Sequence, residues 1–294
     1  MFSGSLVAIV TPMKSSGEID YKSFKRLVDW HLVSNTDGLV ILGSTGEAST
    51  ITFTERTKII HQVVNQVNKE IPVLVGTGSN STSHTIELTQ HAMKSGADAA
   101  LIVTPYYNKP TQEGLFQHFR TISEAVPIPQ ILYNVPSRTA CDLLPKTIKR
   151  LAKYCHNIVG IKEATGDIGR VKQLLQETNR LDLFSGDDNT AMDFILSGGK
   201  GVISVIANIL PKQLHTLCMA AISSKVEAAK KYNDKLLPLY RLLSIESNPI
   251  PIKWALTRMG MIPEGIRLPL TSFNEKYHKK MRKVMHQIGI KNLL

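Results

Sequence analysis

The chain has 294 residues, of which 43% are hydrophobic and 20% are charged, a composition typical of ordinary soluble globular proteins. A chain of this length can bury one large core or two smaller ones. No apolar stretch approaches the length of a membrane span, and no basic residue precedes the short apolar run from Leu6 to Val10, so we expect neither a membrane-spanning helix nor a secretory signal.

The net charge of +11 raises the question of nucleic-acid binding, because a basic domain is its usual electrostatic sign. Residues 275–294 hold six Lys or Arg against one acidic residue, whereas the rest of the excess is spread thinly. A basic face on a terminal helix is more often simply solvated. We therefore expect no nucleic-acid partner, although a basic surface also attracts anionic metabolites.

The three cysteines, Cys141, Cys155 and Cys218, are an odd number and form no C-x-x-C pair. This pattern argues against a disulfide framework and against a zinc site. A reducing cytoplasm is therefore the expected location.

Short apolar runs and amphipathic stretches alternate along the first 225 residues. The first run, Leu6 to Thr11, leads through a turn to apolar positions at helical spacing, for which Asp20 is the expected N-cap. Further helices are expected to begin at Thr54, Ser81 and Gln112. Seven more strand-like runs lie at residues 39–42, 72–75, 99–103, 131–133, 158–162, 181–185 and 201–205.

Eight strand-like runs, each followed by a helix-like segment, predict a closed (β/α)8 (TIM) barrel, because eight such units in roughly 220 residues fit closure better than an open sheet. A doubly wound open sheet is the alternative, since periodicity does not show closure. Beyond residue 225 the strand pattern stops, and residues 226–243, 251–259 and 272–288 are expected to be helical. We therefore divide the chain into a catalytic barrel, residues 1–225, and a C-terminal helical region, residues 226–294.

In such a barrel, the residues that follow the strands face one common mouth, where active sites lie. Hydroxyl groups, one arginine and one lysine would surround this mouth. The segments that follow the second to eighth strands are Gly43–Glu47, Gly76–Gly78, Thr104–Asn108, Tyr133–Arg138, Lys162, Gly186–Asp188 and Ser204.

Lys162 ends a continuous apolar run that is typical of a buried parallel strand. A lysine at a strand-to-helix junction is usually a solvated charge, but an amine among tyrosines, without metal or flavin motifs, indicates Schiff-base chemistry on a carbonyl substrate. The attacking amine must be neutral, and burial would lower its pKa from about 10.4. Glu163 should point away from the barrel interior and should not pair with Lys162. The proton transfers then need another group, and Tyr133 is the expected proton shuttle.

Other chemistries lack their motifs. Gly43 to Glu47 would aim backbone and hydroxyl donors at an anion, but no Lys-Ser/Thr pair follows as in a P-loop, and Gly76-x-Gly78 lacks the third glycine of a dinucleotide fingerprint. Asp187 and Asp188 have no histidine partner in their loop, so no metal site is expected. Neither H-E-x-x-H nor G-x-S-x-G occurs.

Three segments together resemble the signatures of the pyruvate-dependent class I aldolase and lyase family: Gly43–Glu47, Tyr133–Arg138 and Gly160–Gly166. The similarity runs essentially end to end. It implies a homotetrameric barrel, a dimer of dimers, that condenses pyruvate with L-aspartate 4-semialdehyde in diaminopimelate and lysine synthesis. It also implies a covalent Schiff base and no other cofactor.

The resemblance implies four catalytic residues. Lys162 would form the Schiff base with pyruvate, and Tyr133 would move protons. Ser44 would relay them together with Tyr107, which the neighbouring subunit would donate. Many relatives carry threonine at the position of Ser44, so the relay is expected to have a somewhat looser geometry here.

The resemblance also implies four substrate-binding residues. Thr45 would hold the carboxylate of pyruvate, and Arg138 the carboxylate of the second substrate, with the backbone of Gly186 and Ile203 lining the pocket. Sugar-acid lyases of the same superfamily share the Ser-Thr pair but lack the arginine. Arg138 therefore favours an enzyme that condenses pyruvate with L-aspartate 4-semialdehyde. A sugar-acid lyase is the second hypothesis, and a non-catalytic basic binding protein is the third.

Family members that lysine inhibits bind it at a subunit interface. The corresponding positions here are Ala48, Ser49, Phe53, Arg56, Asn80, His84 and Tyr106. Inhibitable members commonly carry a histidine near the position of Arg56 and a glutamate at that of His84, and the glutamate pairs with the amino group of the inhibitor. Two basic side chains would instead repel a cationic effector, so we predict weak or absent lysine inhibition.

Overall fold

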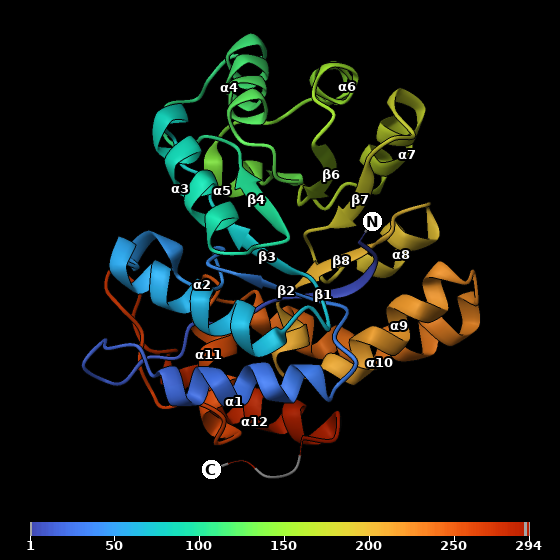
Figure 1. Cartoon of the computed structure of the whole chain (residues 1–294). Helices are drawn as coiled ribbons and strands as arrows, with labels where there is room; N and C mark the ends of the chain where they lie inside the picture. The colour runs from blue at the N-terminus through green and yellow to red at the C-terminus, as the bar shows by residue number, and fades with distance from the viewer. Residues whose placement is uncertain (1, 291–292, 294) are drawn as a thin grey trace.

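The computed structural model describes residues 2–290 and 293. Its eight strands are all parallel and close into a barrel in sequence order, with β8 paired to β1 (Figure 1). Closure confirms the predicted (β/α)8 barrel and excludes the open sheet. The strands are β1 (Gly4–Ala8), β2 (Gly38–Ile41), β3 (Val73–Gly76), β4 (Ala99–Val103), β5 (Gln130–Asn134), β6 (Ile158–Glu163), β7 (Asp182–Ser185) and β8 (Gly201–Ser204).

Helices connect successive strands and cover the outside of the barrel (Figure 1). They are α1 (Tyr21–Leu32), α2 (Phe53–Val67), α3 (Thr82–Lys94), α4 (Gln112–Ala125), α5 (Pro136–Thr139), α6 (Pro145–Tyr154), α7 (Ile168–Glu177), α8 (Ala191–Leu196) and α9 (Pro211–Ile222), with the short 3-10 turns η1 (Ala48–Thr50) and η2 (Ile206–Asn208). Each expected strand-like run overlaps a strand, and the ends differ by at most three residues.

Side-chain caps explain where the first helices begin. The Asp20 carboxylate accepts hydrogen bonds from the backbone N–H groups of Lys22 and Ser23, which confirms the predicted N-cap of α1. Thr52 and Glu55 form a reciprocal capping box, so α2 begins at Phe53, one residue before the expected start. Ser81 caps α3 in the same way as Asp20 caps α1.

The strands are buried on both faces, as their continuous apolar runs predict. One set of side chains fills the inside of the barrel and includes Leu6, Val40, Leu74, Leu101 and Phe184. Alternate residues point outward and pack against the surrounding helices, as Val7, Leu39 and Ile41 do. The barrel is therefore a packed core, and only its mouth is left open for a ligand.

The C-terminal region consists of α10 (Val226–Leu243), α11 (Ile250–Arg258), the 3-10 turn η3 (Glu275–Tyr277) and α12 (His278–Gln287). The first two agree with the expected helices, but the third was predicted to begin at Ser272 and does not. Residues 272–274 are not helical, because Asn274 is extended and its side chain accepts from the Lys276 N–H to start η3.

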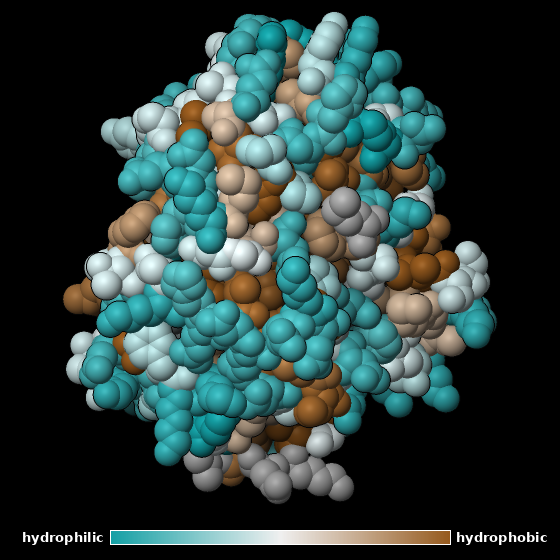
Figure 2. All heavy atoms as spheres, in the orientation of Figure 1, coloured by the Kyte–Doolittle hydropathy of each residue, from teal (hydrophilic) through white to brown (hydrophobic). Residues whose placement is uncertain are grey.

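These C-terminal helices share one hydrophobic core with strands β1 to β3 and β8 and with the helices next to them. Phe24 and Leu27 of α1 lie in the same cluster as Leu239 of α10 and Met281 of α12. Figure 1 shows this region in orange and red on one side of the molecule, with α9 next to α10. The surface view is mainly hydrophilic, with small scattered hydrophobic patches (Figure 2). In the described part of the chain, no helix is both long and apolar enough to cross a membrane.

Candidate active site

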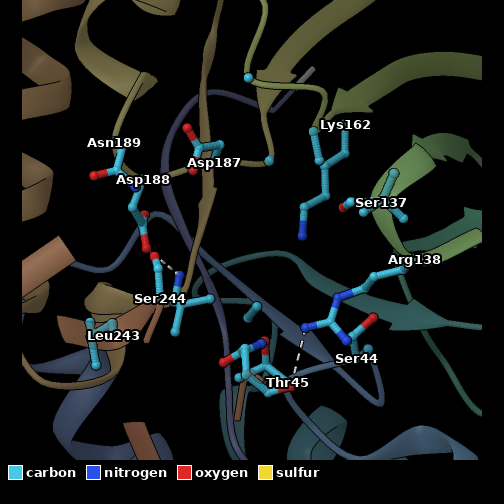
Figure 3. A pocket seen from close by; sticks show the side chains of 18 of the residues that line it. Ser44, Thr45, Ser137, Arg138, Lys162, Asp187, Asp188, Asn189, Leu243 and Ser244 are labelled. Carbon is cyan, nitrogen blue, oxygen red and sulfur yellow. Dashed lines mark hydrogen bonds between the residues drawn. The ribbon is translucent and has the colours of Figure 1, made fainter. Parts of the chain in front are cut away.

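A cavity of about 750 Å³ opens at the carboxyl ends of the strands. The loops after β2, β5, β6 and β7 supply one part of its wall, and the end of α10 with the following segment supplies another (Figure 3). It therefore lies where ligands bind in this fold. The lining residues include Ser44, Thr45, Tyr133, Arg138, Lys162, Gly186, Asp187, Asp188, Leu243, Ser244 and Asn248.

Lys162 lies near the end of β6 and is only 6% exposed. Its amine points into the cavity, on the side that faces Arg138 and Thr45 (Figure 3). Burial lowers its pKa to about 8, with a smaller contribution in the same direction from Arg138 and an opposing one from Asp188. About a tenth of the amine is therefore neutral at pH 7, against a few parts in ten thousand for a free lysine.

Tyr133 lies beside this amine because β5 and β6 pair in a register that places the two residues opposite each other. The Lys162 Nζ lies 4.3 Å from the centre of the Tyr133 ring. Burial raises the pKa of the phenol, while Arg138 and a hydrogen bond with Ser44 act in the opposite direction. The phenol can thus hold and transfer a proton next to the amine.

Glu163 follows Lys162 but faces the other side of the strand. Its carboxylate accepts hydrogen bonds from Asn134 Nδ2 at 3.1 Å and from the Thr165 N–H at 2.8 Å. Across the described residues it forms no ion pair with Lys162. Glu163 therefore does not stabilise the protonated amine of Lys162 as an ion-pair partner, and burial lowers the pKa of this amine.

The side chains of Thr45 and Arg138 lie on the opposite side of the cavity from Asp187 and Asp188 (Figure 3). The Thr45 hydroxyl belongs to the loop after β2, and the Arg138 guanidinium belongs to α5, a single turn that Pro136 begins. Asn248 contacts both: its Nδ2 donates to Thr45 Oγ1 at 2.9 Å, and its carbonyl accepts from Arg138 Nη2 at 3.2 Å. The Thr45 hydroxyl and the Arg138 guanidinium are both groups that can donate hydrogen bonds to a carboxylate.

Asn248 and the segment 243–247 are site residues that were not assigned a role from the sequence. The family resemblance extends to this part of the chain, but nothing in the spacing of its residues indicates contact with a loop more than 200 residues away. Residues 243–247 show no motif at all. Only the packing of α10 and α11 on the barrel brings them to the mouth.

Gly186 and Asp188 line the wall formed by β7 and its loop. A side chain at position 186 would meet the Ala164 Cβ at 2.5 Å and the Lys162 Cε at 3.0 Å, so only glycine leaves room for the lysine. Asp188 Oδ2 accepts from the N–H groups of Val205 and Ile206, and burial raises the pKa of this carboxyl. In residues 2–290 and 293, no group of three or more His, Cys, Asp or Glu side chains could hold a metal ion.

Two of the expected site residues are not part of the cavity wall. The wall includes Val205 but not Ile203, whose side chain is buried inside the barrel. The expected contact was with the backbone of Ile203, and it stays a prediction. Tyr107 is 87% exposed, has a positive φ of 77° and is absent from the cavity wall of its own chain.

A second cavity, of about 620 Å³, adjoins the first and shares Ser44, Tyr133 and Arg138 with it. Most of the positions that correspond to the lysine-binding site line it, but Asn80 does not, although Ser79 does. Arg56 is buried there and donates to the Gly76 carbonyl at 2.7 Å, and burial lowers its pKa to about 10. The lining includes Ala48, Ser49, Phe53, Arg56, His84 and Tyr106.

Comparisons with known proteins identify the family of the chain and agree with its fold. A family model described as "Dihydrodipicolinate synthetase family" matches residues 1–288. The 4-hydroxy-tetrahydrodipicolinate synthase of Coxiella burnetii (strain Dugway 5J108-111) is 70% identical and covers 99% of this chain and 100% of its own, and that of Pseudomonas aeruginosa is 53% identical with 99% of each chain covered.

Among solved structures, the chloride inhibited dihydrodipicolinate synthase from Acinetobacter baumannii, complexed with pyruvate, is similar over 99% of this chain and 100% of that one. Its sequence identity is 51% and its TM-score is 0.97.

Proposed function

The chain belongs to the dihydrodipicolinate synthetase family, and we propose that Lys162 carries out the family's reaction in the cavity at the barrel mouth. The protein is a lyase of the class I aldolase type. It condenses pyruvate with L-aspartate 4-semialdehyde in the diaminopimelate and lysine pathway. The observation that supports Lys162 most directly is its buried amine, whose pKa is lowered to about 8 beside a tyrosine.

The reaction begins when the neutral Lys162 amine attacks the keto carbon of pyruvate. Loss of water from the adduct leaves a protonated imine, and loss of a methyl proton then gives an enamine. The enamine carbon attacks the aldehyde of the second substrate, and the new alkoxide takes up a proton. Tyr133 is placed to move these protons, with the Ser44 hydroxyl as its hydrogen-bond partner.

Ring closure releases the enzyme. The amino group of the bound semialdehyde portion attacks the imine carbon, the bond from that carbon to Lys162 breaks, and the amine leaves with a proton. Thr45 holds the pyruvate carboxylate, while Arg138 binds the carboxylate of the second substrate through its planar fork. Gly186 leaves space beside the Lys162 side chain for these steps, because it has no Cβ.

Several further properties are part of the proposal. The covalent link through Lys162 makes a separate cofactor unnecessary. The partners are the two small substrates and other copies of this chain, assembled as a homotetramer in which Tyr107 completes a neighbouring site. The location is the cytoplasm, which agrees with the three buried, free cysteines. The division between a barrel, residues 1–225, and a helical region, residues 226–294, stays a prediction.

Borohydride trapping tests the proposal. Reduction in the presence of pyruvate should fix the imine as a stable secondary amine, and peptide mass spectrometry should find the adduct on Lys162. The Lys162→Met variant should give no adduct, and Lys153→Met, which changes an exposed lysine, should be labelled like the wild type. Labelling of the wild type at another lysine, or no labelling at all, would contradict the proposed role.

A sugar-acid lyase is the second candidate, because the Ser44-Thr45 pair also fits that branch of the superfamily. Arg138 favours the synthase, since its guanidinium lines the same cavity as the lysine amine. Assays with pyruvate and either L-aspartate 4-semialdehyde or N-acetylmannosamine separate the two. Turnover only with the semialdehyde is the expected result.

A further inference from the structure

A buried ion pair joins the loop that carries Thr45 to the C-terminal helical region. Glu47 lies two residues after Thr45, and Lys253 lies on α11. Lys253 Nζ lies 2.5 Å from Glu47 Oε1, and the two side chains are only 5% and 1% exposed. The second carboxylate oxygen accepts from the Arg267 N–H at 3.2 Å. Both oxygens of Glu47 are therefore bound by residues of the C-terminal region.

The loop itself has a constrained backbone. Glu47 has φ 56°, a left-handed conformation that residues other than glycine rarely adopt and that persists only where the surroundings fix it. Gly46 is equally confined, because a Cβ there would meet the Leu42 nitrogen at 3.1 Å, and its carbonyl accepts from Thr11 Oγ1 at 2.7 Å. The barrel holds one side of the loop, and the Glu47 carboxylate is held from the C-terminal region.

The same C-terminal segment contacts both carboxylate-binding groups. Asn248 stands just before α11 and donates to Thr45 Oγ1, and its carbonyl accepts from Arg138 Nη2. The Lys253 N–H in turn bonds to the Pro249 carbonyl in the first turn of α11. Since a helix moves as a rigid unit, a shift of Lys253 relative to Glu47 would carry Asn248 away from Thr45 and Arg138.

Stability alone does not explain a buried ion pair, because apolar residues of similar volume are often at least as stabilising. What such a pair can do is fix one register between two elements. We propose that Glu47 and Lys253 are positioning residues: their ion pair sets α11 against the loop after β2, and so places Thr45 and Arg138 for the two substrate carboxylates. This inference rests on the proposed function.

The test removes both charges together with the double substitution Glu47→Gln and Lys253→Met. The introduced amide can still accept from the Arg267 N–H, and no charge is left buried without a partner, so the protein should fold with a Tm close to that of the wild type. Borohydride should still trap pyruvate at saturation. The pyruvate concentration for half-maximal trapping and the KM for the semialdehyde should both rise, by about 10-fold to 100-fold.

The matched control is the double substitution Glu177→Gln and Lys149→Met, which removes an ion pair whose lysine is 60% exposed. It should leave both quantities unchanged. The positioning role would be overturned if the Glu47→Gln, Lys253→Met protein kept the wild-type pyruvate concentration for half-maximal trapping and the wild-type KM for the semialdehyde, while the wild type itself was trapped normally. Failure of the wild type to be trapped would instead contradict the proposed function, so the two failures are distinguishable.

Discussion

The lowered pKa of Lys162 decides how the first chemical step responds to pH. Below about pH 8 the amine is mostly protonated and cannot attack, so its neutral fraction falls about tenfold for each pH unit. We expect the single-turnover rate of imine formation to rise tenfold from pH 6 to about pH 7 and to level off above 8. A midpoint near 10 would show an unperturbed lysine.

Asp188 supplies a control for this pH profile. Its charge favours the protonated lysine and so opposes the effect of burial. The Asp188→Asn variant should therefore move the midpoint of imine formation to lower pH. A shift to higher pH would contradict the assigned electrostatics.

Arg138 should act on one substrate only. Losing a charged hydrogen bond to a carboxylate costs about 1.5 to 3 kcal/mol, so Arg138→Ala should lower kcat/KM for L-aspartate 4-semialdehyde by roughly 10-fold to 100-fold. Borohydride trapping of pyruvate should change much less. Equal losses for both substrates would show that the arginine does not distinguish between them. Arg120→Ala, at an exposed surface pair, is the matched control.

We predict that Arg56 and His84 set the response to lysine. Both line the second cavity, and Arg56 has no acidic partner among the described residues. A cationic amino acid would therefore meet two basic side chains. We expect weak or no inhibition by lysine in steady-state assays, and inhibition at sub-millimolar concentrations would contradict the prediction.

Arg267 connects the C-terminal region to α2. Its guanidinium donates to both oxygens of Glu55, at 2.5 and 2.9 Å, and to the Gly17 and Thr50 carbonyls. The bond to Arg267 lowers the pKa of Glu55 from 4.5 to about 2, so the free energy from this contact is present above pH 4.5 and is lost as the pH falls through about 2.

The free energy of unfolding of the Glu55→Gln variant should therefore be about 1 to 3 kcal/mol lower than that of the wild type at pH 7. This difference should shrink toward pH 2. Urea unfolding at several pH values measures both. Glu264→Gln, at an exposed pair with Arg258, should cost less than about 1 kcal/mol. A Glu55 effect that did not depend on pH would contradict the assigned ion pair.

Element types followed from local patterns, whereas some boundaries did not. The expected helix over residues 226–243 agrees with α10, because its apolar spacing and its end are both local features. The helix expected from Ser272 begins later, because Phe273 packs beside Trp254 in the core and Asn274 caps a new turn. Packing against a distant helix thus overrode the periodicity at that point.

In the assembled protein, Tyr107 should act across a subunit boundary, since it is exposed and lies outside the cavity of its own chain. Lys162→Ala chains and Tyr107→Phe chains should each be nearly inactive. When equal amounts of the two variants are unfolded and refolded together, about half of the pairs should contain one chain of each kind. One of the two sites in each mixed pair then has both intact residues, so about a quarter of wild-type activity should return. No recovery would show that Tyr107 acts within its own chain or not at all.

Local features of the sequence were enough to predict the alternation of strands and helices and the residues that follow each strand, because these depend on period and residue type along short segments. The Schiff-base chemistry of Lys162 stays a prediction from the same features and from the family resemblance. The folded chain was needed to show that the sheet closes, that Asn248 contacts Thr45 and Arg138, and that Glu47 pairs with Lys253. These contacts join residues far apart in the chain, and no local pattern specifies them.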